Sequence, residues 1–175
     1  MSDAELRGRQ VLLRPSVTAD RERLLAIRTT PEVAAWWDPP PPDWPANDAG
    51  THRYTVVTDH RIIGFVQWYE NSDPEYAHAG LDLFLDSAVH GRGLGRDVVQ
   101  TVLRHLLDDV GHHRVVIDPA ASNAAAIACY RACGFREVGV MRWYELHVAS
   151  GRWRDGLLME YAVDPAGVRP GASRE

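Results

Sequence analysis

The stretch Leu81–Leu85 (Leu-Asp-Leu-Phe-Leu), followed by His90–Arg96 (His-Gly-Arg-Gly-Leu-Gly-Arg), decides the fold of this chain. The first run predicts a strand, the second a glycine turn, and the spacing of apolar residues from there to Asp109 predicts a helix. This succession aims the free N–H groups of the first helical turn, with the positive end of the helix dipole, at one point. A phosphate-bearing ligand is therefore the first functional hypothesis.

The glycines of this turn narrow the class of phosphate ligand. Gly91, Gly93 and Gly95 have no Cβ, so the backbone can approach a bulky oxyanion closely. Their spacing lacks the G-x-G-x-x-G interval of a dinucleotide fold, and no second βαβ half follows. A nucleoside-triphosphate loop would need Gly-Lys-Ser/Thr where this chain has Gly95-Arg96-Asp97. Both nucleotide classes are therefore disfavoured.

Length and composition favour one compact domain, because the chain has 175 residues and 45% of them are hydrophobic. We expect residues 1–165 to form this domain and the Pro/Gly-rich residues 166–175 to form a disordered tail. The net charge of −5, without a basic stripe, argues against a nucleic-acid partner and fits a cationic small molecule better. With neither a signal-peptide pattern nor a long apolar run, a cytoplasmic protein without a membrane partner is expected.

The cysteines and histidines add two further expectations. Cys129 and Cys133 are the only cysteines and lie four positions apart on a predicted helix, so we interpret them as reduced packing residues. The eight histidines do not follow a metal-ligand spacing, and no metal is expected.

Alternating and helical patterns outline the other elements. The predicted strands are Gln10–Arg14, His52–Thr58, Arg61–Glu70, His78–Leu85, His113–Ile117, Phe135–His147 and Trp153–Val163. The predicted helices are one carrying Leu24, Leu25 and Ile27, one over Pro31–Trp37, one after the glycine turn, and one from Ser122 or Asn123 to Cys133. This order predicts an α/β fold with a mixed, mostly antiparallel central sheet flanked by helices.

A second signature follows the fifth predicted strand, in the pattern Asn123-x-x-Ala126-Ile127-x-x-Tyr130-x-x-x-Gly134-Phe135. Together with the glycine turn it resembles the GCN5-related N-acetyltransferase (GNAT) family, and the resemblance spans Val11–Val163. It implies the GNAT fold and acetyl-CoA as cosubstrate. One departure is His90, where the family more often has Gln or Arg. The coenzyme contacts implied by the resemblance are Leu83, Phe84, Leu85, His90, Gly91, Arg92, Gly93, Leu94, Gly95, Arg96, Asn123, Ala126 and Tyr130.

Two residues are the catalytic candidates. Asp82 lies on the opposite strand face from its leucine neighbours, and its carboxylate could hold an ammonium group and accept its proton; a solvated carboxylate on an edge strand is the alternative. The resemblance implies that Tyr130 is the general acid, and its alternative is a core tyrosine. The resemblance also implies that a backbone N–H between Leu83 and Leu85 stabilises the oxyanion. Asn123 either contacts the pantetheine arm, caps its helix, or does both.

Within the family, the sequence is most similar to aminoglycoside 6′-N-acetyltransferases. The matching pieces are Pro31–Trp37, Ile63–Gln67, Gly80–Asp82 and Ile117–Pro119. The likeness implies a cationic amine acceptor, an aminoglycoside modified at its 6′-amine. The candidate acceptor-binding residues are Trp36, Trp37, Asp38, Gln67, Glu70, Asp82 and Asp118. Asp43, Asp73 and Glu75 could extend them into an acidic rim that attracts a polyamine.

Three alternatives stay open at this point. The same chemistry could serve another amine, such as a protein N-terminus, a polyamine or a siderophore precursor. A non-catalytic module could bind acyl-CoA or a cationic drug, although such a module needs neither a base at Asp82 nor an acid at Tyr130. The protein could be a monomer, or a homodimer formed through the edge of the closing hairpin.

Overall fold

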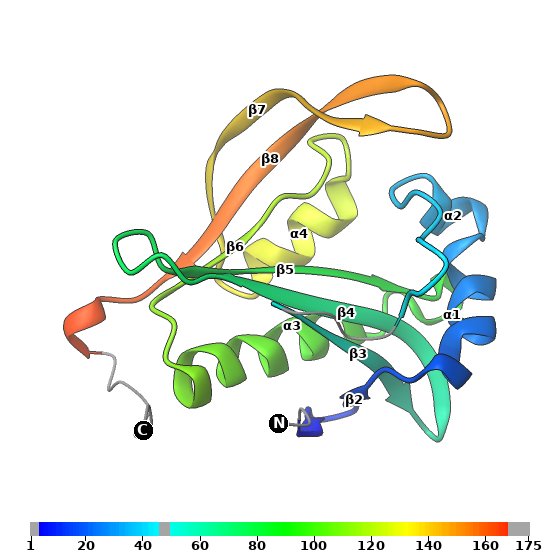
Figure 1. Cartoon of the computed structure of the whole chain (residues 1–175), viewed down its shortest axis with the longest axis horizontal. Helices are drawn as coiled ribbons and strands as arrows, with labels where there is room; N and C mark the ends of the chain where they lie inside the picture. The colour runs from blue at the N-terminus through cyan, green and yellow to red at the C-terminus, as the bar shows by residue number, and fades with distance from the viewer. Residues whose placement is uncertain (1–3, 46–49, 168–175) are drawn as a thin grey trace.

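Eight strands form one sheet in the computed structural model, which describes residues 4–45 and 50–167 (Figure 1). The strands are β1 (Leu6–Arg7), β2 (Leu12–Pro15), β3 (Thr51–Thr58), β4 (Arg61–Asn71), β5 (His78–Leu85), β6 (Arg114–Ile117), β7 (Arg136–His147) and β8 (Arg152–Ala162). Their order across the sheet is β1-β2-β3-β4-β5-β6-β8-β7. Neighbouring strands are antiparallel except β5 and β6, which are parallel because the helix of the glycine turn connects them. The expected α/β fold with a mixed, mostly antiparallel sheet is confirmed.

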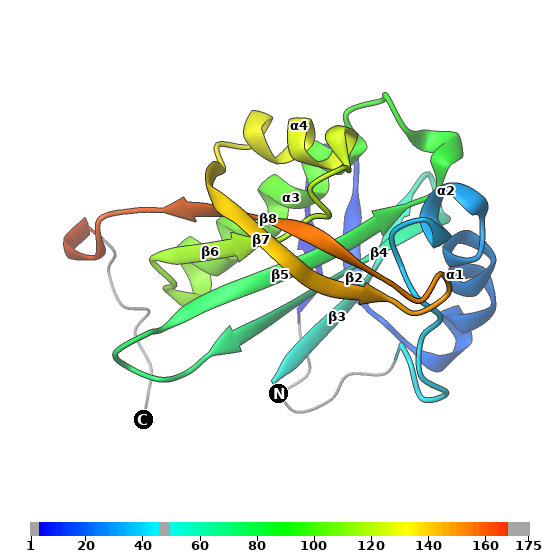
Figure 2. The same ribbon diagram turned by 90° about the horizontal axis from the view of Figure 1, so that it is seen from above.

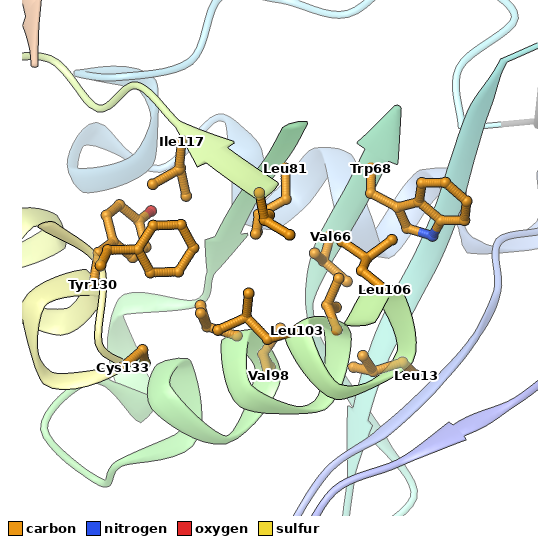
Figure 3. Packing of buried hydrophobic residues seen from close by; sticks show 14 of the residues in the cluster. Leu13, Val66, Trp68, Leu81, Val98, Leu103, Leu106, Ile117, Tyr130 and Cys133 are labelled. Atoms are coloured by element: carbon orange, nitrogen blue, oxygen red, sulfur yellow. The ribbon is translucent and has the colours of Figure 1, made fainter. Parts of the chain in front are cut away.

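Helices cover both faces of this sheet. They are α1 (Arg21–Arg28), α2 (Pro31–Ala34), α3 (Leu94–Arg104) and α4 (Ala124–Ala132), and a π-helical segment, His105–Val110, prolongs α3. On one face, Leu24 and Ile27 of α1 pack against Phe65 and Phe84 of the sheet. On the other face, α3 and α4 bury the larger core, which Figure 3 shows around Val66, Leu81, Val98 and Leu103.

Strand alternation decides which face each β5 side chain joins. Leu81 and Leu85 belong to the core beneath α3 and α4, whereas Phe84 belongs to the core beneath α1. Asp82 is two residues from Phe84 and therefore lies on the α1 face, opposite its leucine neighbours. This placement agrees with the predicted alternation.

The N-terminal segment differs from its prediction. The strand expected at Gln10–Arg14 begins at Leu12, and a short strand, β1, precedes it. The backbone N–H groups of Gln10 and Val11 donate instead to the buried carboxylate of Asp97 on α3, at 2.7 and 3.1 Å. A partner 86 residues away fixes this turn, so no local pattern could reveal it.

α2 also differs, because it ends at Ala34 rather than at Trp37. Pro39 disfavours helical backbone at Asp38. The carbonyl groups that leave the helix find arginine donors: Arg154 binds the oxygens of Ala35 and Trp36 at 2.9 and 2.8 Å. These contacts let the chain turn away from helical geometry without losing hydrogen bonds.

Other local predictions are confirmed. The two-residue turn Asp59-His60 has positive φ at both residues, as a tight hairpin turn requires. Gly134 ends α4 with φ of +98°, and Asn123 caps the helix by accepting the N–H of Ala126 at 3.2 Å. At the C-terminus, Pro165–Gly167 forms a short 3-10 turn, while residues 168–175 of the expected tail lie outside the described residues.

The hairpin of β7 and β8 contains an irregularity that shapes the site. The register shifts between Met141 and Glu145, so three residues face Asp155 alone. At the centre, Trp143 has φ of +53°, and its N–H donates to Asp155 Oδ1 at 2.9 Å. The ring of Tyr144 then lies so close to Gly156 that a Cβ there would approach it to 2.8 Å. Figure 2 shows the hairpin crossing over β5 towards α2.

Candidate active site

A gap in the sheet creates the site. β5 and β6 pair only at Ala79 with Val115 and Gly80 with Val116, and beyond Gly80 the two strands part. A cleft of about 1540 Å³ opens there and passes between the two faces of the sheet. That volume exceeds the ~300–1,000 Å³ of a site for one drug-sized ligand. The cleft can therefore hold two molecules that meet at the gap.

We call the part of the cleft beside α3 and α4 the donor half. Its residues are Leu83–Leu85, His90, Gly91, Gly93–Arg96, Asn123–Ala126 and Ala128–Tyr130. We call the part beneath the hairpin the acceptor half. Its residues are Arg28, Glu32, Trp36–Asp38, Asp118, Tyr144, Glu145 and Arg154. Asp82 lies where the two halves join.

The glycine turn builds the donor half from main-chain atoms. Gly91 and Gly93 have φ of +75° and +78°, a region that L-residues with a Cβ avoid. Gly93 is the N-cap of α3, and the first intrahelical bond runs from the N–H of Asp97 to its carbonyl oxygen at 3.1 Å. Leu94, Gly95 and Arg96 lie between Gly93 and Asp97. Their N–H groups have no acceptor within the helix and point out of its N-terminal end. The predicted anion site is therefore present as a geometry.

Two side chains, those of His90 and Arg96, complete this half. The ring of His90 lies 3.1 Å from the carbonyl oxygen of Leu85, so the histidine braces the turn against the end of β5. Arg96 adds a positive charge to the lining. Arg92, predicted as a coenzyme contact, is exposed and lies outside the cleft lining.

Tyr130 of α4 reaches the same cleft from the α3 face. The residue is buried, with 7% of its surface exposed, and Figure 3 shows it close to Ile117 and Leu81. Burial raises the pKa of its hydroxyl far above the ordinary value, and the charges of Cys129 and Asp82 add to the effect. The hydroxyl therefore keeps its proton throughout the physiological range and can act only as a donor of it.

Asp82 reaches the cleft from the opposite face. Gln67 Nε2 donates to its Oδ2 at 3.1 Å and holds the carboxylate in place. Burial raises the pKa of Asp82 to about 6, the charges of Asp118 and Glu145 act in the same direction, and the bond from Gln67 opposes them. A carboxylate of this pKa is ionised at neutral pH, yet is a better proton acceptor than an exposed aspartate.

The acceptor half is acidic and aromatic. Tyr144 donates its hydroxyl proton to Asp118 Oδ2. Burial raises the pKa of Asp118, against the effect of that hydrogen bond. Trp37 packs edge-on against Phe84, with ring centroids 5.1 Å apart, whereas Trp36 lies 6.0 Å from the Arg154 guanidinium. Arg28 and Arg154 also line this half. Carboxylates outnumber them and give the lining a net negative charge; they are those of Asp82, Glu32, Asp38, Asp118 and Glu145.

Contacts between distant segments close this half. Asp38 accepts the N–H of Val148 at 3.1 Å, while His147 Nε2 lies 3.3 Å from the carbonyl oxygen of Ala34. Arg154 pairs with Glu145 at 2.8 Å in addition to holding the α2 carbonyls. The hairpin is thus fastened to α2 and to the segment that follows it.

The structure separates some of the residues that were predicted together. The Glu70 side chain lies on the opposite face of the sheet from that of Asp82. Its Oε2 lies 3.2 Å from His112 Nε2, and the residue does not line the cleft. Gln67 touches Asp82 but does not itself line the cleft. The cleft lining also leaves out the other loop acids of the predicted rim, which are Asp43, Asp73 and Glu75.

Sequence reasoning missed Glu32, Tyr144, Glu145 and Arg154. Glu32 lies inside Pro31–Trp37, a stretch that carried the resemblance, and could have been found there. The other three depend on the hairpin irregularity, which no pattern in the sequence announces.

Two properties of the described chain limit its chemistry. Within residues 4–45 and 50–167, no group of three or more His, Cys, Asp or Glu side chains could hold a metal ion. The same residues include no helix that is long and apolar enough to cross a membrane.

Comparison with known proteins identifies the family. Residues 21–135 match the acetyltransferase (GNAT) family, and the chain belongs to it. Over 100 residues the chain is 35% identical to aminoglycoside N(6′)-acetyltransferase type 1 of Klebsiella pneumoniae, a match covering 50% of this chain and 49% of that protein. The chain therefore spans about half the length of this curated relative.

Solved structures confirm the fold. Ribosomal-protein-S5-alanine acetyltransferase from Vibrio fischeri superposes with a TM-score of 0.80 and 18% identity, covering 96% of this chain and 100% of that one. Aminoglycoside acetyltransferase AAC(6′)-Ib in complex with coenzyme A gives a TM-score of 0.67 and 20% identity, covering 89% and 96%. At these identities the likeness establishes the GNAT fold and does not distinguish between acceptors.

Proposed function

We propose that this protein transfers an acetyl group from acetyl-CoA to the 6′-amine of an aminoglycoside in a ternary complex. One observation carries the proposal. The Asp82 carboxylate, with a pKa of about 6, lies at the gap where a backbone-lined anion site meets the acidic, aromatic acceptor half. A cationic nucleophile bound on one side would meet an anionic acyl carrier bound on the other.

The donor half fits coenzyme A. The N–H groups of Leu94, Gly95 and Arg96 suit its diphosphate, because they are free donors at the positive end of an 11-residue helix. The main chain of Leu83–Leu85 borders the cleft beyond the last pairing with β6 and can bind the pantetheine arm. When bound there, acetyl-CoA supplies an activated acetyl thioester.

The side chains at the gap have complementary roles. Asp82 attracts the acceptor ammonium and takes its proton, which leaves a neutral amine as the nucleophile. A backbone N–H between Leu83 and Leu85, where β5 has no pairing with β6, would donate to the carbonyl oxygen as it gains charge. Tyr130, whose pKa is raised, retains a proton that it can give to the departing thiolate.

The acceptor half supports a polycationic amine. Four carboxylates besides Asp82 line it: Glu32, Asp38, Asp118 and Glu145. The 35% identity to an aminoglycoside acetyltransferase over half of the chain supports the 6′-amine in particular. A second candidate is the N-terminal amine of a protein, favoured by 37% identity over 71 residues, 41% of this chain and 42% of that protein, to N-alpha-acetyltransferase RimI of Mycobacterium tuberculosis.

Thiol release tests the proposal. The protein is incubated with acetyl-CoA and kanamycin-type aminoglycosides, and matched compounds with a 6′-hydroxyl serve as controls. We expect turnover with the 6′-amine and none with the 6′-hydroxyl. Equal turnover of the 6′-amine and 6′-hydroxyl compounds would reject the 6′-amine as the acceptor group. Faster turnover of peptides that begin with alanine would favour the second candidate. Drug binding without thiol release would instead indicate a sequestering module.

A further inference from the structure

The two cysteines of α4 occupy different environments. Sequence analysis treats Cys129 and Cys133 alike, as packing residues one helical turn apart. In the structure Cys133 is buried, whereas Cys129 is only half-buried and lines the donor half of the cleft. The mechanism proposed above uses neither thiol.

Cys129 lies against the glycine turn. Its Sγ is 3.5 Å from the position that a Cβ would occupy on Gly95, in the first turn of α3. The free N–H groups and positive dipole end of α3 are therefore close to this sulfur, as is the charge of Arg96. Such surroundings stabilise a thiolate over a thiol.

The surroundings of Cys133 also favour Cys129 as the more acidic of the two thiols. The Sγ of Cys133 donates to the carbonyl oxygen of Arg96 at 3.9 Å. The neighbouring Cys133 thiol, and to a smaller extent the charge of Arg96, lower the pKa of Cys129 against the effect of burial. The pKa of Cys133 is raised, first by the neighbouring Cys129 thiol and then by burial. Of the two sulfurs, the one with more thiolate character is the one that faces the cleft.

We propose that Cys129 is a modification site, a reactive thiol that takes peroxides and low-molecular-weight disulfides, and that its modification prevents coenzyme binding. An adduct on Sγ would occupy space beside the N–H groups of Leu94–Arg96, where the diphosphate is proposed to bind. Coenzyme and adduct would therefore exclude each other. This second part of the inference rests on the proposed function, whereas the reactivity of the thiol does not.

The chemistry balances with a peroxide as oxidant. The thiolate sulfur attacks the O–O bond, takes one oxygen as a sulfenic acid and releases the other as hydroxide or an alkoxide. Cys133 is not placed to form a disulfide with this sulfur, because Cβ atoms four residues apart on a helix are about 5–6 Å apart and a disulfide needs about 3.5–4.5 Å. The sulfenic acid therefore persists until an external thiol reduces it.

Reaction kinetics with dithiobis-nitrobenzoate test the reactivity on the full chain. We expect one thiol to react at least about tenfold faster than N-acetylcysteine at the same pH, and the Cys129→Ser variant to lose this phase. Cys133→Ser is the matched control and should retain the fast phase. Equal rates for both cysteines, or a Cys129 rate no faster than N-acetylcysteine, would overturn the inference.

Protection and inactivation test the consequence. Saturating acetyl-CoA should slow the fast phase at least about tenfold, and hydrogen peroxide should abolish acetyl-CoA binding by calorimetry until dithiothreitol is added. Cys129→Ser should bind acetyl-CoA equally before and after peroxide. If acetyl-CoA binds and gives no protection, the inference fails while the proposed function stands. If Cys129 reacts fast but acetyl-CoA never binds, the proposed function fails and the reactive thiol remains.

Discussion

The donor and acceptor halves of the cleft are built in different ways. The donor half consists mainly of backbone N–H groups from one short stretch, Gly91–Arg96, fixed by glycines at positive φ. The acceptor half consists of side chains from α2, the end of β6 and the β7–β8 hairpin, joined by contacts such as Arg154 with Ala35.

This difference separates coenzyme binding, which many enzymes share, from acceptor binding, which varies between them. A backbone site recognises a diphosphate whatever the neighbouring side chains are, so it can serve one coenzyme across many enzymes. A site built from side chains can change its acceptor by exchanging a few residues of a hairpin. We therefore expect substitutions in the two halves to have separable effects, on coenzyme affinity and on acceptor use respectively.

The largest effect is expected at Asp82, where the halves join. Asp82→Asn keeps the shape but removes the proton acceptor, so kcat should fall about 10²–10⁴-fold while the acetyl-CoA affinity hardly changes. The wild-type kcat/KM should rise with pH up to about 6 as this carboxyl ionises, and the variant should lack that limb. Thiol-release assays from pH 5 to 9 measure both. A variant of full rate would show that Asp82 is not the base.

Asp82→Asn should raise the stability of the folded protein, although it lowers the rate. The folded pKa of about 6 lies above the ordinary aspartate pKa of 3.8, so the folded state loses stability as pH rises between these values and the buried carboxyl becomes charged. Asp82→Asn should therefore be more stable than wild type above pH 6, by at most ~3 kcal/mol, and nearly equal to it at pH 4. Urea unfolding at several pH values measures this difference.

Asp20 is the matched control for this measurement. Burial alone would raise its pKa, but hydrogen bonds from Arg14, the Val17 N–H and Thr55 outweigh burial and lower it. Its charged form therefore contributes stability above its unfolded pKa, and that stability is lost as pH falls. Asp20→Asn should destabilise the protein at neutral pH. If Asp82→Asn and Asp20→Asn shift the stability in the same direction, the conclusion that the charged form of Asp82 destabilises the fold and that of Asp20 stabilises it is wrong.

A third effect separates the donor half. Gly93→Ala places a Cβ at φ of +78°, which costs ~1–2 kcal/mol and should weaken acetyl-CoA binding about tenfold by shifting the turn. Gly95→Ala is the control, because Gly95 is helical and its Cβ would meet Cys129 Sγ at an ordinary 3.5 Å. Calorimetry measures both affinities. Equal losses in the two variants would mean that steric access, rather than backbone conformation, governs the site.

The smallest effect should fall on the acceptor half. Asp155→Ala frees the N–H of Trp143, loosens the hairpin irregularity and should raise the acceptor KM about fivefold, the equivalent of ~1 kcal/mol. Asp155→Asn keeps an oxygen acceptor and should restore most of the wild-type value. The acetyl-CoA affinity should not change in either variant, and a change there would contradict the separation of the halves.

The same contrast explains what the sequence could reveal. The donor half is local, so the glycine turn and the Asn123 cap could be predicted from neighbouring residues. The strand alternation that places Asp82 is equally local. The acceptor half depends on contacts between residues more than 100 positions apart, such as Asp38 with Val148. Tyr144 escaped prediction for another reason, because its position depends on the register shift between Met141 and Glu145.

Glu70 shows the limit of reasoning from composition. Glu70 lies near the end of the strand beside Asp82, which suggested a shared acidic rim. However, Gln67 is the residue paired with Asp82, and Glu70 is three positions further along, so its side chain lies on the other face of the sheet, near His112. The shortening of α2 has a similar cause, because the arginine that binds its last carbonyls belongs to β8.

Comparing coenzyme A with pantetheine tests the central claim most directly, namely that main-chain N–H groups at the start of α3 bind the diphosphate. The two ligands share the thiol arm, and only coenzyme A carries the diphosphate and nucleotide. We predict by calorimetry that coenzyme A binds the wild-type protein at least about 100-fold more tightly than pantetheine, and that Gly93→Ala narrows this ratio. Equal affinities, or no binding of coenzyme A, would contradict the account.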